Sequence, residues 1–167
     1  MKRALFIGRF QPFHNAHLVD VKKVLKEVDE VVIAIGSSQG KNTLENPFSY
    51  NERKQMIINV LKKNKIKKYK IYPVPDLYND RKWVGYIKKN LPSCEFVYSG
   101  NLWTLRCFKR FDLKVKKIKL IKGISSTIIR NMVIKNKNWK KLVPKEIADY
   151  IGKINGVGRV KKTYNKN

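Results

Sequence analysis

The sequence predicts an α/β protein with a doubly wound parallel sheet. Short apolar runs typical of buried strands alternate with amphipathic segments of helical period along nearly the whole chain. Strict alternation of this kind is typical of parallel strands joined by right-handed helical crossovers. No linker or internal repeat interrupts it, and 167 residues with 43% hydrophobic and 30% charged side chains suit one globular domain, so we expect a single domain over residues 1–167.

The first half of the chain contains three predicted strands. They are the apolar runs at residues 3–10, 30–36 and 70–75. Helices are expected between them, at residues 17–28 and 49–64. Ser49 and Glu52 have the spacing of a capping box, which marks the start of the second helix.

The second half continues the same order. Strands are expected at residues 95–100 and 113–120, and helices at residues 81–91, 101–111, 125–136 and 144–154. The run at 113–120 alternates polar and apolar residues, which favours a place near a sheet edge. From about residue 125 the chain is predicted to be helical and basic, ending in a flexible tail at residues 162–167.

The net charge of +26 predicts attraction to polyanions but does not choose among nucleotides, nucleic acid and anionic membranes. Thirty of the 38 basic residues are Lys, and 15 residues are Asn, a bias that AT-rich coding DNA also produces. Sixteen basic residues from Lys114 onward, with Trp139, Tyr150 and Tyr164 among them, keep a nucleic-acid-binding module as an alternative. We do not favour it over compositional bias.

Targeting features point to the cytoplasm. No apolar run is long enough to span a bilayer, and the amino terminus lacks the pattern of a signal peptide, so no membrane partner is expected. Cys94 and Cys107 lack metal-site spacing and are predicted to be thiols without a disulfide.

Both histidines of the chain lie in the segment that follows the first predicted strand. His14 and His17 are three residues apart, at the start of a helix and so on nearly one face. The amide groups and dipole of a helix start favour an anion, and Arg9 with two imidazoles would complete a phosphate cradle. Two histidines with no third ligand nearby make a metal site the weaker interpretation, so we expect no protein-held metal.

Two segments resemble the signatures of the nucleotidyltransferase superfamily. "GRFQPFHNAH" is similar to the HxGH motif, and "ISSTIIR" at residues 124–130 is similar to ISSTxxR. Further segments resemble the archaeal type of nicotinamide-nucleotide adenylyltransferase: "GSSQ", "ENPFSYNER", "WVGYI", "YSGN" and "INGVGRV". The resemblance extends to about residue 162 and implies a Rossmann-like nucleotidyltransferase fold.

The resemblance implies transfer of AMP from ATP to the 5'-phosphate of nicotinamide mononucleotide (NMN), which forms NAD and pyrophosphate, with Mg²⁺ bound to the ATP phosphates. His14, His17 and Arg130 are then the catalytic residues. The expected ATP contacts are Gly8, Arg9, Phe10, Ser125, Ser126 and Thr127. The chemistry needs positioned reactants and neutralised charge rather than a covalent nucleophile.

For the mononucleotide, the resemblance favours Trp83, whose flat indole could stack on a pyridinium ring. A core tryptophan anchoring its helix is the alternative. The other expected contacts are Gly36, Ser37, Asp76, Asp80 and Asn101. Asp80 stands where the family carries Asn, and a carboxylate there should repel a nicotinate, so the preference between the two mononucleotides stays open.

Ala16 replaces the motif glycine, and its methyl group is expected to crowd the adenosine. The nearest alternative function is a related nucleotidyltransferase acting on pantetheine phosphate, FMN or a polyol phosphate. The family often forms hexamers, which implies a homo-oligomer here.

Overall fold

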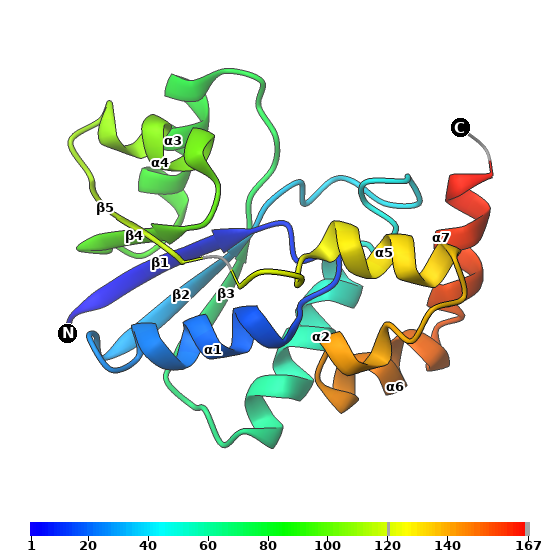
Figure 1. Cartoon of the computed structure of the whole chain (residues 1–167). Helices are drawn as coiled ribbons and strands as arrows, with labels where there is room; N and C mark the ends of the chain where they lie inside the picture. The colour runs from blue at the N-terminus through cyan, green and yellow to red at the C-terminus, as the bar shows by residue number, and fades with distance from the viewer. Residues whose placement is uncertain (120, 166–167) are drawn as a thin grey trace. The chain divides into compact units, whose positions relative to one another are not determined.

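Five parallel strands form one sheet in the computed structural model, which describes residues 1–119 and 121–165. They are β1 (Arg3–Gly8), β2 (Glu30–Ile35), β3 (Tyr69–Pro73), β4 (Phe96–Ser99) and β5 (Lys114–Lys117). Their order is β3-β2-β1-β4-β5, with β1 at the centre (Figure 1). The chain builds outward from β1 to β3 and then, on the other side, to β4 and β5, so the doubly wound prediction is confirmed.

The predicted helices are present with small shifts at their ends. They are α1 (Asn15–Val24), α2 (Tyr50–Lys63), α3 (Asp80–Asn90), α4 (Leu102–Lys109), α5 (Ser126–Ile134) and α6 (Lys145–Lys153). A 3-10 turn at Lys140–Leu142 precedes α6. The strand predicted at 113–120 becomes β5 at an edge of the sheet, as expected, and residue 120 lies outside the described residues.

A seventh helix, α7 (Gly156–Tyr164), lies mostly in the part predicted to be helical but was not predicted as a separate element. Its first turn contains two glycines, which have low intrinsic helix propensity. Packing explains the first of them, because a Cβ on Gly156 would stand 2.9 Å from side-chain atoms of Ile151 and Phe48. Of the expected flexible tail, residues 162–164 belong to α7, and residues 166 and 167 lie outside the described residues.

The described chain divides into two compact units. The sheet unit comprises residues 1–8, 20–38 and 68–119, and the helical unit comprises residues 9–19, 39–67 and 121–165. That the chain forms a single domain stays a prediction. No helix in residues 1–119 or 121–165 has the length and apolarity needed to cross a membrane.

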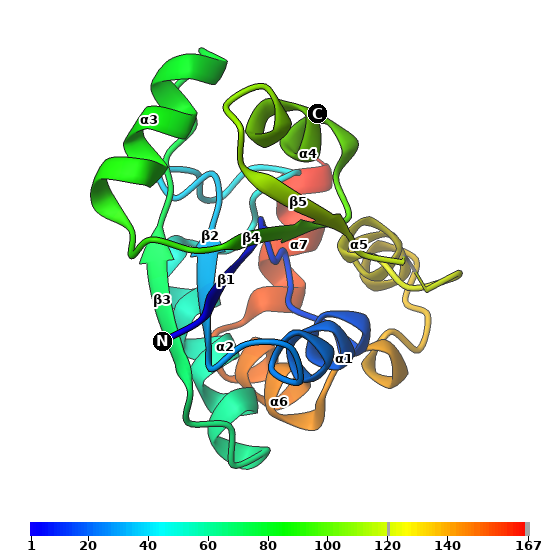
Figure 2. The ribbon, with the colours of Figure 1, turned by 90° about the vertical axis from the view of Figure 1, so that its left-hand side faces the viewer.

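One face of the sheet packs against α3 and α4, which lie next to each other on it (Figure 2). Leu5 and Ile7 point to this face because alternate residues of a strand share a side. Trp83 and Ile87 on α3 and Phe108 on α4 cover them. Full burial of an apolar side chain of this size contributes about 1.5–3 kcal/mol.

In the helical unit, α2 packs against α6, and α7 packs against α5 and α6. The predicted capping box is confirmed: Ser49 Oγ accepts a bond from the Glu52 amide, and the Ser49 amide donates to Glu52 Oε2 at 2.8 Å. Arg159 of α7 lies 2.7 Å from both Glu52 oxygens. Burial raises the pKa of Glu52, but Arg159 and Ser49 outweigh it, so the pKa is lowered and the ion pair ties α7 to the start of α2.

Candidate active site

The loop after β1 is held from inside by a buried glutamine. Gln11 is 1% exposed, and its Nε2 donates to the Phe48 carbonyl at 2.8 Å while its Oε1 accepts from the Phe48 amide at 3.0 Å. Phe10 adopts a left-handed backbone with φ of 52°, which is costly for a residue with a side chain. The two hydrogen bonds from the Gln11 side chain to the backbone of Phe48 therefore stabilise a loop conformation that is unfavourable for Phe10 itself.

Two buried arginines hold the same loop through its carbonyl groups. Arg53 Nη1 donates to the Arg9 carbonyl at 2.7 Å, and Arg130 Nη1 donates to the Gln11 carbonyl at 2.9 Å. Arg130 also reaches Thr127 Oγ1 at 3.4 Å. Burial lowers the pKa of Arg130, the positive charge of Arg9 lowers it further, and Glu45 partly offsets both. The fold thus brings the predicted phosphate-binding arginine of α5 onto the loop after β1.

The two histidines are stacked, with ring centroids 3.5 Å apart and planes 14° from parallel. The His17 amide donates to His14 Nδ1 at 3.4 Å, and the His14 amide donates to His17 Nδ1 at 3.3 Å. This is the reciprocal pattern of a capping box at the start of α1, built from imidazoles. Because each Nδ1 accepts a bond, the proton of each neutral ring is on Nε2.

Both rings are held in the neutral form. Burial lowers the pKa of His14 from 6.5 to about 4. Burial also lowers the pKa of His17 well below its ordinary value, and the neighbouring His14 adds to this effect. At neutral pH the pair therefore carries two Nε2–H donors and no charge.

The start of α5 contributes hydroxyl groups to the helical unit. Ser125 caps the helix, since its Oγ accepts from the Ile128 amide at 3.1 Å. Ser126 Oγ donates to the Pro12 carbonyl at 2.9 Å, which joins α5 to the loop that precedes His14. The capping role considered from the sequence is thus observed for Ser125.

Arg9 is more exposed than the two buried arginines, Arg53 and Arg130. Its Nη1 forms an ion pair with Glu45 Oε2 at 3.1 Å. Sequence reasoning did not single out Glu45, Arg53 or Gln11, although all three lie in segments quoted for the resemblance. No local sequence pattern predicts that an Arg or Gln is buried, so the supporting roles of Arg53 and Gln11 could not be recognised from the sequence. Arg9 and the neutral histidines belong to the loop and helix start that Arg130 contacts, and together the four residues are a candidate anion site within the helical unit.

The predicted mononucleotide contacts belong to the sheet unit, at or after the carboxyl ends of its strands. The Gly36 amide donates to the Gly8 carbonyl at 2.9 Å, which joins the ends of β1 and β2. Ser37 is buried and has a left-handed backbone with φ of 47°. Asp76 lies in the loop between β3 and α3. Asn101 caps α4, with its Oδ1 accepting from the Thr104 amide at 3.1 Å.

Trp83 lies in the core of the sheet unit and is 6% exposed. Its ring centroid lies 5.4 Å from that of Phe108 and 5.1 Å from that of Trp103. Trp103, in the first turn of α4, is 51% exposed. This burial fits the anchoring role considered as the alternative for Trp83, and its contact with the mononucleotide stays a prediction. Trp103 is a more exposed indole that sequence reasoning did not single out.

Asp80, the first residue of α3, pairs with Arg110 at the end of α4, with Nη1 and Oδ2 3.4 Å apart. Arg110 was not anticipated, and its charge offsets the repulsion that Asp80 would exert on an anion. Burial raises the pKa of Cys107 to about 11, and a hydrogen bond to Asp80 adds to this. Cys94 and Cys107 are both free thiols, as predicted.

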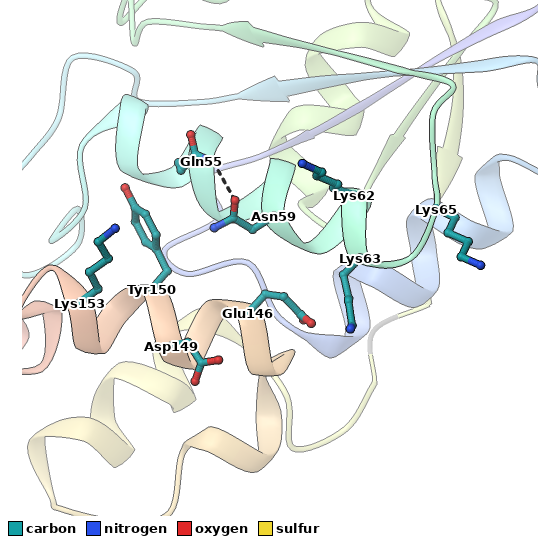
Figure 3. Close-up of a pocket in the computed structure, with 9 residues that line it drawn as sticks. All are labelled: Gln55, Asn59, Lys62, Lys63, Lys65, Glu146, Asp149, Tyr150 and Lys153. Carbon is teal, nitrogen blue, oxygen red and sulfur yellow. Dashed lines mark hydrogen bonds between the residues drawn. The ribbon is translucent and has the colours of Figure 1, made fainter.

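A hollow of about 850 Å³ lies between α2 and α6 (Figure 3). Lys62 and Lys63 line it from α2, and Glu146, Asp149 and Tyr150 line it from α6. None of the predicted site residues lines this hollow. It is a feature of the helical unit separate from the candidate anion site.

Comparison with known proteins identifies the family. The Cytidylyltransferase-like family model matches residues 5–132. The nicotinamide-nucleotide adenylyltransferase of Pyrococcus furiosus is 40% identical over 166 residues, covering 96% of this chain and 88% of the relative. That of Methanococcus aeolicus is 41% identical over 162 residues, covering 96% and 94%. The chain belongs to the nicotinamide-nucleotide adenylyltransferase family. The resemblance drawn from the sequence motifs is confirmed.

The fold of this adenylyltransferase family member also matches solved structures. A bifunctional NMN adenylyltransferase/ADP ribose pyrophosphatase from Francisella tularensis, complexed with AMP and a Mn ion, aligns with a TM-score of 0.82 at 24% identity. The match covers 99% of this chain and 53% of that one, so the chain spans about half the length of the bifunctional protein. The Rossmann-like fold prediction is confirmed by this likeness.

Proposed function

We propose that this chain transfers the adenylyl group of ATP to the 5'-phosphate of NMN, forming NAD and pyrophosphate. The observation that carries the proposal is the anion site of the helical unit, in a chain that belongs to the nicotinamide-nucleotide adenylyltransferase family. Its two neutral imidazoles and two arginines suit a triphosphate.

The reaction exchanges one bond at the α-phosphorus for another. An oxygen of the NMN phosphate attacks the α-phosphorus, and the bond from that phosphorus to the α,β-bridging oxygen breaks. Pyrophosphate leaves with the electron pair of the broken bond. No protein nucleophile enters this sequence, so the side chains accelerate it by aligning two anions and stabilising charge on the departing oxygen.

His17 donates from Nε2 to the α-phosphate, and His14 donates toward the pyrophosphate side. A neutral imidazole suits this role because it supplies a directed N–H and can become cationic when a phosphate stands beside it. Arg130 holds the β- and γ-phosphates, with Ser126 and Thr127 beside it. Its burial strengthens the interaction, since charges attract more strongly away from water.

The remaining ATP contacts are Gly8, Arg9, Phe10 and Ser125. Arg9 must leave Glu45 to reach a phosphate, and an exposed ion pair of this kind is worth at most about 1 kcal/mol. Replacing the Glu45 ion pair of Arg9 by a phosphate contact therefore costs little free energy. The NMN contacts are Trp83, Asp76, Asp80, Asn101, Gly36 and Ser37, all in the sheet unit.

Mg²⁺ enters with ATP, because phosphate oxygens are the hard ligands that it prefers. In residues 1–119 and 121–165 no three His, Cys, Asp or Glu side chains are grouped so that they could hold a metal. Bound Mg²⁺ would neutralise phosphate charge and so ease attack by a second anion. A homo-oligomer, a hexamer by family resemblance, and a cytoplasmic location complete the proposal.

The test is an assay of pyrophosphate release with ATP and Mg²⁺. NMN, nicotinate mononucleotide, pantetheine phosphate and FMN are supplied separately, and products are separated to detect NAD. We expect rapid release with NMN and none with pantetheine phosphate or FMN. Fastest release with either of the latter two would replace NMN by that acceptor, and no release with any of them would refute the enzymatic function.

The His17→Ala variant tests the site itself in the same assay. Loss of one donor to a developing negative charge lowers kcat by about 10²–10³. Asn15→Ala, on the same helix turn, is the matched control and should keep most of the activity. Equal loss in both variants, or a loss that follows unfolding in circular dichroism, would assign His17 a structural role.

A further inference from the structure

We propose that the hollow between α2 and α6 is a second binding site, which takes a nucleotide that carries both phosphate and a positively charged pyridine ring. The ligand class follows from the side chains that line the hollow. That such a nucleotide is a substrate or product of this chain rests on the proposed function. The hollow and all of its lining residues belong to the helical unit.

The hollow has the size of a ligand site. Its volume of about 850 Å³ falls within the range of roughly 300–1,000 Å³ that small-molecule sites occupy. Each helix lines it with one polar stripe, because residues three or four positions apart share a helix face. The stripes consist of Gln55, Asn59, Lys62 and Lys63 on α2, and of Glu146, Asp149, Tyr150 and Lys153 on α6 (Figure 3).

The charged groups around the hollow are not paired with one another. Among the ion pairs within residues 1–119 and 121–165, none involves a charged side chain of the hollow. Glu146 is half-buried, and a carboxylate that loses hydration without gaining a cation is unfavourable. Opposite charges that line one hollow without pairing can be satisfied by a ligand that carries both signs. The charged side chains concerned are Lys62, Lys63, Lys65, Lys153, Glu146 and Asp149.

Two side-chain amides in the hollow match a primary carboxamide. Gln55 Nε2 donates to Asn59 Oδ1 at 2.7 Å (Figure 3). This bond holds the two amides together and leaves Gln55 Oε1 to accept and Asn59 Nδ2 to donate. A carboxamide offers the complementary N–H donor and C=O acceptor. Nicotinamide carries this group, whereas the carboxylate of nicotinate has no N–H to donate.

The other lining residues suit the remaining parts of such a nucleotide. Tyr150 is half-buried and extends from α6 toward α2, so that its ring can stack on a pyridine ring (Figure 3). Glu146 and Asp149 attract the positive charge of that ring, and Lys62 and Lys63 attract phosphate. Because lysines outnumber carboxylates in the hollow, a ligand with a net negative charge is still attracted.

The two carboxylates also disfavour ligands that are purely anionic. ATP or a nucleic acid would bring phosphates close to Glu146 and Asp149, and this repulsion offsets part of the attraction by the lysines. An oxidised pyridine nucleotide can place its cationic ring near the carboxylates instead. NMN and NAD share this chemistry, and the experiments below distinguish them.

The first experiment counts bound nucleotide by equilibrium dialysis of the full chain with labelled NAD and, separately, labelled NMN. We expect a second equivalent per chain beyond the one at the reaction site, and the nucleotide that fills it more tightly is the ligand of the hollow. Lys62→Gln/Lys63→Gln should weaken this second equivalent about tenfold at low salt, because two exposed charge contacts are lost. Pyrophosphate release with ATP and NMN should stay within about twofold of the wild type, because neither lysine belongs to the reaction site.

Lys135→Gln/Lys137→Gln is the matched control. Both lysines are exposed residues of the helical unit that do not line the hollow, and the change in net charge is the same. The control should keep the second equivalent. A single equivalent in the wild type, or equal weakening in both double variants, would overturn the proposal.

The second experiment tests the preference for a charged ring. NADH keeps the phosphates and the carboxamide of NAD, but its reduced ring is neutral. The second equivalent should therefore bind NAD several-fold more tightly than NADH, and Glu146→Gln/Asp149→Asn should abolish this difference. Equal binding of NAD and NADH by the wild type would overturn the role of the two carboxylates.

Two readouts separate this site from the proposed function. Pyrophosphate release with NMN but only one bound equivalent would leave the function intact and remove the hollow as a site. A second equivalent that weakens in Lys62→Gln/Lys63→Gln, without pyrophosphate release from any acceptor, would keep the site and refute the function. Altered sedimentation of this variant with unchanged nucleotide binding would overturn the proposal and assign the hollow to contact between copies of the chain.

Discussion

The stacked histidines predict a specific dependence of stability on pH. The pKa of His14 is about 4 in the folded protein and 6.5 in an unfolded chain. The unfolded state therefore binds more protons between these values, and the histidine lowers stability as pH falls from 6.5 toward 4. Above pH 6.5 its contribution is fully present.

The size of the effect follows from the two pKa values of His14. The loss is about 2 kcal/mol at pH 5 and about 3 kcal/mol at pH 4, relative to neutral pH. His14 is 6% exposed, so solvent screening does not reduce these figures greatly. His17 acts in the same direction, because burial and its neighbour lower its pKa as well.

The assay is urea unfolding of the wild type and of His14→Gln at pH 7.5, 6.5, 5.5 and 5.0. Gln can still accept the His17 amide through its side-chain oxygen, but it does not titrate. We expect the free energy of unfolding of the variant to be lower at pH 7.5, with a deficit that shrinks by about 2 kcal/mol at pH 5. A deficit that is constant across the series would refute the argument that burial keeps His14 neutral.

Two further predictions concern charges near α1 and the loop after β1. Burial raises the pKa of Asp20 from 3.8 to about 6, so its contribution to stability falls as pH rises through that range. Asp20→Asn should raise the free energy of unfolding at pH 7.5 by about 2–3 kcal/mol and by much less at pH 4, measured by urea unfolding; no gain at pH 7.5 would contradict the burial argument. Glu45→Gln frees Arg9 and removes a negative charge near the anion site, so KM for ATP should fall about threefold at low salt and less at high salt. Glu95→Gln, an exposed change in the sheet unit, is its control, and an equal fall there would mean that net charge alone is responsible.

Much of the fold could be predicted because its signals are local. Apolar runs and helical periods placed β1, β2 and α2, and the capping box of Ser49 and Glu52 was visible from spacing alone. The helix α7 could not be predicted in this way. It depends on the close approach of Gly156 to Phe48 and on the pairing of Arg159 with Glu52, which are both contacts distant in sequence.

The candidate site, too, was predictable only where its signals are local in the sequence. The spacing of His14 and His17 predicted a shared face, and the structure adds that their rings stack and exchange hydrogen bonds with each other's amides. The supporting roles of Gln11 and Arg53 had no signal in the sequence. A buried polar side chain is recognisable only when its partners from distant segments are known.

The sequence by itself determined the alternation of strands and helices, the family, and the set of residue types able to hold a triphosphate. These are carried by neighbours along the chain, where periodicity and motif spacing are directly visible. Only the tertiary structure decided which groups are charged and which rings are accessible. Burial, which no local pattern specifies, makes the two imidazoles neutral, places Trp83 in the core and leaves Trp103 exposed.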